Sequence, residues 1–130
     1  MKLVFFLLLS FSFSAWAHQL DFQPYLQMQE ALAADDFKTA LASHERLCKD
    51  ELTMYKASYR NCQNKFTNIE ELRVAFKALS DLYFQHGDKK EIGKLQKATC
   101  PMAKAKWIQK PGELRNPYYG KAMLDCGEKI

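Results

Sequence analysis

The sequence predicts an all-α fold, a small antiparallel bundle of three main helices with a loop-rich C-terminal segment and a short final helix. Between residues 20 and 87, apolar side chains recur at three- and four-residue spacing, which is typical of helices with one buried face. Short polar segments interrupt that pattern, as expected for antiparallel helices joined by brief turns. Because no repeat or low-complexity tract divides residues 18–130, we expect a single helical domain there.

The first helix is expected over residues 22–34. Pro24 suits its first turn, and Asp21 upstream is a plausible cap. A second, longer helix follows, capped by Asp35 or Asp36 and ending near Tyr55. Its predicted buried face consists of Phe37, Ala40, Leu41, His44, Leu47, Cys48, Leu52 and Tyr55.

The third helix is expected to begin at Thr67, which forms a capping-box pattern with Glu70. Its apolar face extends to His86, and Gly87 is a natural C-terminal stop. We expect residues 88–99 to form an extended or short helical connector. A C-terminal segment over residues 100–127 follows, with a short helix near residues 119–124.

The N-terminal residues have the pattern of a signal peptide. Lys2 precedes an apolar stretch over residues 3–13, and Ala15 and Ala17 place small side chains where a signal peptidase cleaves. We therefore expect residues 1–17 to be removed from a soluble periplasmic or secreted protein, without stable membrane insertion after cleavage. Loss of Lys2 lowers the formal charge from +4 to +3, too small a charge to predict nucleic-acid binding.

Residues 100–127, called the cassette below, combine sulfur with aromatic and turn-forming residues. The cassette contains Cys100, Met102, Trp107, Met123 and Cys126, together with an Asn116-Pro117-Tyr118-Tyr119-Gly120 motif. Ordinary packing does not need this mixture. It indicates a shaped loop held by sulfur, through either a disulfide or a soft metal.

The first interpretation is disulfide formation, which an exported protein permits. The most local scheme pairs Cys48 with Cys62 and Cys100 with Cys126. In the chain-entropy model, closing each loop stabilises the fold by about 3 kcal/mol.

The second interpretation is a soft-metal site, since thiolate and thioether sulfur prefer Cu(I), and Ag(I) has similar preferences. Its candidate ligands are Cys100, Met102, Met123 and Cys126, with His86 and His44 available from the bundle. The two interpretations compete at Cys100 and Cys126, because a disulfide leaves no thiolate to bind metal.

The cassette residues resemble the C-terminal signature of a domain-of-unknown-function family in exported bacterial proteins. That domain is also appended to membrane-fusion subunits of copper and silver efflux systems. The resemblance extends upstream to Glu30-Ala31-Leu32 with Asp35-Asp36, and to Arg73, Phe76, Leu79 and Ser80. It implies a small helical domain associated with copper, with efflux components as partners and no established enzymatic activity. The matching cassette positions are Cys100, Met102, Asn116, Tyr118, Met123 and Cys126; Cys48 and Cys62 have no counterpart.

We therefore expect a protein that binds or buffers copper or silver through the cassette, rather than an enzyme. Cys100 beside His44 or His86 lacks the orienting group and oxyanion hole that a nucleophilic site needs. The alternative is a non-metal interaction module stapled by disulfides. Trp107, Tyr118 and Tyr119 would then be its contact residues, since aromatic side chains are enriched at binding hot spots.

Overall fold

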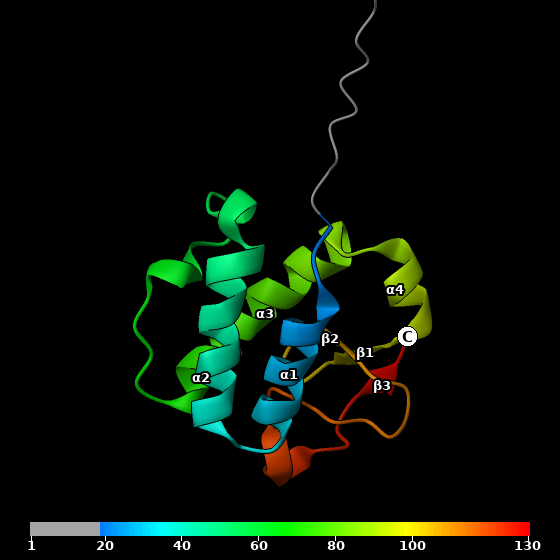
Figure 1. The fold of residues 1–130 in the computed structure, drawn as a ribbon. Coiled ribbons are helices and arrows are strands. Elements are labelled where there is room, and N and C mark those ends of the chain that lie inside the picture. The colour runs from blue at the N-terminus through cyan, green and yellow to red at the C-terminus, as the bar shows by residue number, and fades with distance from the viewer. Residues whose placement is uncertain (1–18) are drawn as a thin grey trace, which may run out of the picture.

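The computed structural model describes residues 19–130, and the signal peptide expected over residues 1–17 lies outside them (Figure 1). The described chain contains helices and a three-stranded antiparallel sheet, so the all-α prediction is wrong. The helices are α1 (Phe22–Ala33), α2 (Phe37–Arg46), α3 (Ile69–His86) and α4 (Lys89–Lys94). The strands are β1 (Gln96–Cys100), β2 (Ala105–Gln109) and β3 (Glu128–Lys129). Short helical turns are η1 (Leu47–Glu51), η2 (Thr53–Tyr55), η3 (Arg60–Gln63) and η4 (Gly120–Met123).

The ends of α1 and α3 follow from their capping residues. The Asp21 carboxylate accepts the Gln23 N–H at 3.0 Å, which caps α1 as predicted. In α3 the cap is Asn68 rather than Thr67, because the Asn68 side chain accepts the Glu71 N–H at 3.0 Å. Glu71 in turn accepts the Thr67 N–H at 2.8 Å. The capping box therefore lies one residue later than the sequence pattern suggested.

The second predicted helix is shorter than expected. α2 ends at Arg46, and the chain widens into the π turn η1, where the Leu52 N–H donates to the Leu47 carbonyl at 2.9 Å. Both leucines are buried there. The chain then reverses through η2 and η3 and brings Cys62 to Cys48, which form the predicted disulfide.

The sheet forms from segments expected to be a connector and a loop. β1 pairs with β2 in antiparallel register, and Ala98 lies opposite Trp107. β3 pairs with the other edge of β1, and Thr99 lies opposite Glu128. The predicted connector at residues 88–99 holds α4 and all of β1 except Cys100, and the final helix is the 3-10 turn η4.

The sheet packs on the helices through a shared aromatic core. β2 contacts α1 and α3, and Figure 1 shows the sheet beside α1, with α2 on that helix's other side. Tyr25 stacks on Phe76, and its hydroxyl accepts the Ile108 N–H of β2 at 3.0 Å. Each large side chain fully buried in this core stabilises the fold by roughly 1.5–3 kcal/mol. Within residues 19–130, none of the helices has the length and apolar character needed to cross a membrane.

Candidate metal centre

Three sulfur-bearing side chains of the cassette meet at one end of the sheet. Cys100 ends β1, and Met102 lies in the turn that leads to β2, with 64% of its surface exposed. β3 returns antiparallel to β1, which brings Cys126, two residues before β3, back to this turn. The Cys126 Sγ lies 3.9 Å from the Met102 Sδ, and the Cys100 thiol is near enough to raise the pKa of Cys126.

The buried Asn116 fixes the loop that carries Cys126. Its Nδ2 donates to the Cys126 carbonyl at 2.7 Å, and its Oδ1 accepts the N–H groups of Tyr118 and Tyr119. Its own N–H donates to the Leu124 carbonyl at 2.7 Å. The family resemblance included Asn116 among its matching positions. Nothing in the sequence predicted that the Asn116 side chain would fix the loop that carries Cys126.

Gly127 allows the same loop to approach the sheet. Its φ of +139° lies in a region that side-chain-bearing residues rarely adopt. A Cβ there would lie 2.7 Å from the Thr99 carbonyl oxygen and 3.0 Å from the Trp107 ring. The close packing of Cys126 beside β1 therefore depends on a glycine at position 127.

Arg73 joins the cassette to the helices. Its buried guanidinium donates to the Pro117 carbonyl at 3.0 Å, the Leu32 carbonyl at 3.0 Å and the Asp35 carboxylate at 2.7 Å. This hydrogen bond holds the pKa of Asp35 below its ordinary value. Arg73 and Asp35, both in the upstream part of the resemblance, thus anchor the loop between α1, α3 and η4.

Both cassette thiols are free in the structure. Partial burial raises the pKa of the Cys126 thiol, and the adjacent Cys100 raises it further. The protonated thiol donates toward the Met102 thioether. Metal binding at these sulfurs would therefore release protons, because the thiolate is the ligand.

The structure does not bring the two candidate histidines to the cassette sulfurs. His44 is buried beside the Cys48–Cys62 disulfide, with its Nε2 2.8 Å from the Tyr59 hydroxyl. His86 is exposed in the last turn of α3, with its ring 5.1 Å from that of Tyr55. α3 passes the cassette near Lys77, whose amine reaches the Ala103 carbonyl, and His86 lies roughly 13 Å further along the helix.

The remaining predicted residues divide between the loop and the core. Met123 is half-buried in η4, and its carbonyl accepts the Cys126 N–H at 3.2 Å. Trp107 is fully buried and Tyr118 is only 8% exposed, so neither serves as a surface contact residue. Tyr119 is half-buried. The aromatic residues proposed as a docking surface are thus mainly the core under the cassette.

The donor set at the sheet end suits a soft monovalent ion. Across residues 19–130, no three side chains drawn from His, Cys, Asp and Glu cluster closely enough to hold a metal. A site here therefore needs the Met102 thioether beside the two cysteines. Two thiolates and a thioether match the preference of Cu(I), whereas structural zinc sites use four ligands drawn from cysteine, histidine and carboxylate. Comparison with protein-family models, curated proteins and solved structures finds no match to this chain.

Proposed function

We propose that this protein binds Cu(I) or Ag(I) through Cys100, Met102 and Cys126, and buffers the ion in an exported compartment. The observation that carries the proposal is the 3.9 Å approach of the Cys126 Sγ to the Met102 Sδ beside the Cys100 thiol. The sulfurs come from two segments that the sheet pairing brings together, and buried polar groups fix the segment that carries Cys126.

The three proposed ligands differ in their exposure to solvent. Cys100 is fully buried, whereas the Met102 side chain is largely exposed. An ion held in this way remains open to ligand exchange on the Met102 side. That suits a buffering or transfer role better than a closed structural site. The proposed role is binding without catalysis, and copper or silver efflux components are the proposed recipients.

The Cys48–Cys62 disulfide supports the exported location, because structural disulfides persist in oxidising compartments. Such a compartment also favours a bridge between Cys100 and Cys126, which would abolish thiolate binding. We propose that the reduced pair is the metal-binding state, and that copper protects it from oxidation.

The test is a Cu(I) titration of the purified protein against a chromophoric Cu(I) chelator, without oxygen and with ascorbate, which leaves the Cys48–Cys62 disulfide intact. We expect one Cu(I) per chain, and the same competition with Ag(I). Met102→Ala should weaken binding, and Cys126→Ser should abolish competition. Met54→Ala is the matched control, since Met54 is 70% exposed and lies in η2. Met123→Ala tests whether this residue supplies a fourth ligand. If the chelator keeps all the copper, the proposal is wrong.

A further inference from the structure

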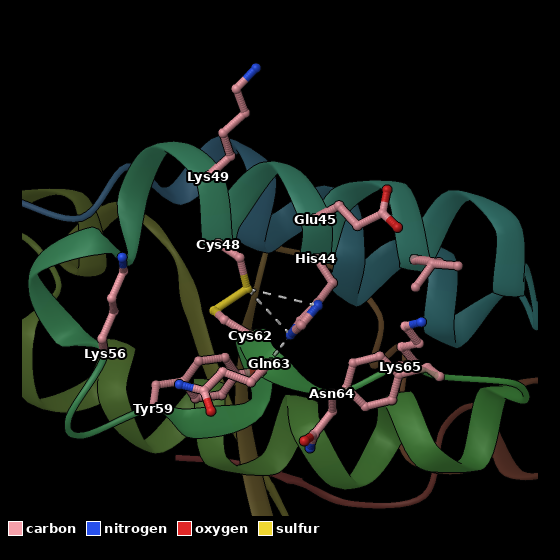
Figure 2. Close-up of a pocket in the computed structure, with 12 residues that line it drawn as sticks. His44, Glu45, Cys48, Lys49, Lys56, Tyr59, Cys62, Gln63, Asn64 and Lys65 are labelled. Carbon is pink, nitrogen blue, oxygen red and sulfur yellow. Dashed lines mark hydrogen bonds between the residues drawn. A yellow bond between two sulfur atoms is a disulfide. The ribbon is translucent and has the colours of Figure 1, made fainter.

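The Cys48–Cys62 disulfide lines an open pocket between α2 and the segment at residues 59–66 (Figure 2). The cavity volume is about 630 Å³, and both cysteines are only half-buried. A disulfide with a purely structural role needs no such access. This one is open to a molecule of roughly tripeptide size, given that typical ligand pockets measure about 300–1,000 Å³.

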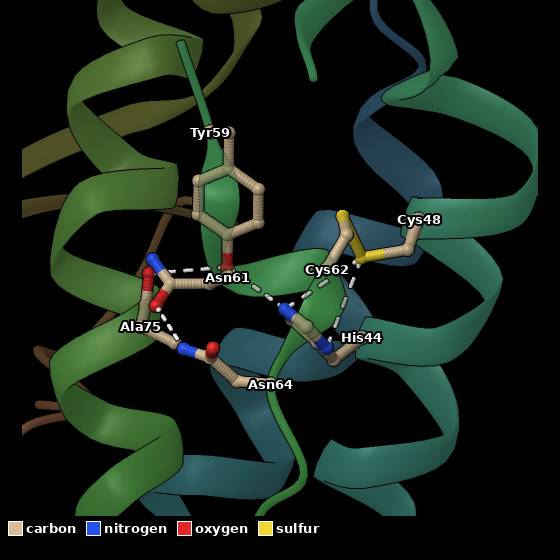
Figure 3. The surroundings of a disulfide bond; sticks show 7 residues. All are labelled: His44, Cys48, Tyr59, Asn61, Cys62, Asn64 and Ala75. Carbon is tan, nitrogen blue, oxygen red and sulfur yellow. Dashed lines mark hydrogen bonds between the residues drawn. A yellow bond between two sulfur atoms is a disulfide. The ribbon is translucent and has the colours of Figure 1, made fainter. Parts of the chain in front are cut away.

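His44 lies against this disulfide in a fixed orientation (Figure 3). The Tyr59 hydroxyl donates to the Ala75 carbonyl at 3.3 Å, so it accepts the Nε2–H of His44 at 2.8 Å. The Nδ1 of His44 then carries a lone pair, and the Cys48 Sγ lies against the ring, 3.9 Å from Nδ1 and 3.8 Å from Nε2. Because Nε2 already donates to Tyr59, Nδ1 is the acceptor within reach of Cys48 when that residue becomes a thiol and its S–H turns toward the ring edge.

The charge of the pocket selects for an anion. Lys49, Lys56 and Lys65 line the pocket and are exposed, whereas Glu45 is the acidic residue among its lining side chains. Figure 2 shows Lys56 and Lys65 on either side of the disulfide, whereas the Lys49 side chain extends away from it. The net positive lining raises the local concentration of anionic molecules and of thiolates in particular.

We propose that the Cys48–Cys62 disulfide is an exchange site for anionic, low-molecular-mass thiols of about tripeptide size. A thiolate attacks the Cys62 Sγ, a new sulfur–sulfur bond forms there, and the bond to Cys48 breaks. Cys48 leaves as a thiolate, takes up the proton that the attacking thiol lost, and donates it in a hydrogen bond to His44. A second thiol then attacks the mixed disulfide. The products are the oxidised small thiol and the reduced pair, so two small thiols lose the two electrons that Cys48 and Cys62 gain.

The leaving role of Cys48 follows from its neighbour. Its sulfur is the one that contacts His44, so the thiol formed there gains a hydrogen-bond acceptor. Cleavage in this direction leaves the mixed disulfide on Cys62.

The test uses the full chain with Cys100→Ser and Cys126→Ser, which removes the cassette thiols and so does not depend on metal binding. This protein is incubated with glutathione at low salt, quenched with acid, alkylated, and analysed by peptide mass spectrometry. We expect glutathione on Cys62 and the alkylated free thiol on Cys48. At equal thiolate concentration, neutral 2-mercaptoethanol should react about tenfold more slowly, because charge steering is lost.

The charge requirement has a matched control. Replacing Lys49, Lys56 and Lys65 by Gln should slow the glutathione reaction about tenfold and leave the 2-mercaptoethanol reaction unchanged. The same substitutions at the exposed Lys89, Lys90 and Lys97 change the net charge equally but lie outside the pocket, and should have little effect. The proposal is overturned if the two triple variants react with glutathione at the same rate or if glutathione appears on Cys48. It is also overturned if the Cys100→Ser, Cys126→Ser protein with all its lysines forms no mixed disulfide.

Discussion

Asn116 holds Cys126 in place through a 2.7 Å hydrogen bond from its Nδ2 to the Cys126 carbonyl. Asn116 is fully buried and also accepts two backbone N–H groups of the loop. One polar side chain therefore determines both the shape of the Asn116–Gly120 motif and the position of a proposed metal ligand.

Replacing Asn116 by Ala should lower both stability and metal affinity. The loss leaves buried backbone groups without partners, and we expect the free energy of unfolding to fall by about 2–4 kcal/mol. Urea unfolding measures this change, and the chelator competition should show weaker Cu(I) binding in the same variant. Asn64→Ala is the control, because Asn64 is exposed and its side chain bonds only to Asn61 among the described contacts. Unchanged copper affinity in a folded Asn116→Ala protein would show that the loop position does not matter for binding.

Gly127→Ala should be more harmful than Gly112→Ala. Both glycines have φ near +140°, so both variants share the backbone strain, about 1–3 kcal/mol. An added Cβ meets nothing within 4 Å at Gly112, but it meets Thr99 and Trp107 at Gly127. Because the added methyl group overpacks the site, we expect Gly127→Ala to lower the free energy of unfolding by about 1–3 kcal/mol more than Gly112→Ala, as measured by urea unfolding. Equal losses at the two positions would contradict the close approach of this loop to β1.

The affinity for Cu(I) should rise with pH. The raised pKa of the Cys126 thiol keeps it protonated near neutrality, so metal binding must displace its proton. Each proton released contributes about a tenfold gain in affinity per pH unit below the thiol pKa. Chelator competition of the unsubstituted protein at pH 6, 7 and 8 measures the slope. A pH-independent affinity would argue for binding by the methionines without the thiols.

The buried His44 should make the fold sensitive to mild acid. Burial lowers the pKa of His44 from 6.5 to about 4, so the unfolded chain takes up a proton first as the pH falls. Stability should therefore decline between pH 6.5 and about 4, by roughly 2–4 kcal/mol in total. Urea midpoints measured across this range test the effect. His44→Gln should flatten the decline, whereas His86→Gln on the exposed end of α3 should preserve it.

The sequence predicted the parts of the fold that depend on local periodicity. α1 and α3 have long apolar faces and clear capping residues, and Cys48 and Cys62 lie close enough along the chain to suggest their bridge. The strands were missed because β1 reads Gln-Lys-Ala-Thr-Cys and has little apolar surface of its own. It is a strand because Ala98 and Cys100 point into a core built by α1 and α3, a tertiary effect that local propensity does not contain.

The candidate site was predicted in part. The sequence named Cys100, Met102 and Cys126 as candidate ligands, but it did not show that Met102 lies in a turn or that β3 brings Cys126 to this turn. His44 and His86 lie on the predicted buried faces of their helices. Helical periodicity predicts that such a face is buried, but it does not predict which distant residues will lie beside it. The anchoring by Arg73 spans 44 residues to Pro117, a separation that no local pattern encodes.

The two pairs of cysteines lie in different parts of the fold. α2 leads into η1, which carries Cys48, whereas β1 ends at Cys100. Figure 1 shows α2 and the sheet on opposite sides of α1, so the disulfide and the cassette sulfurs are separated by the helical core. Thiol–disulfide scrambling between Cys126 and Cys48 therefore requires the molecule to open. A single native chain can therefore keep Cys48 and Cys62 oxidised while Cys100 and Cys126 stay reduced, without thiol–disulfide exchange between the two pairs.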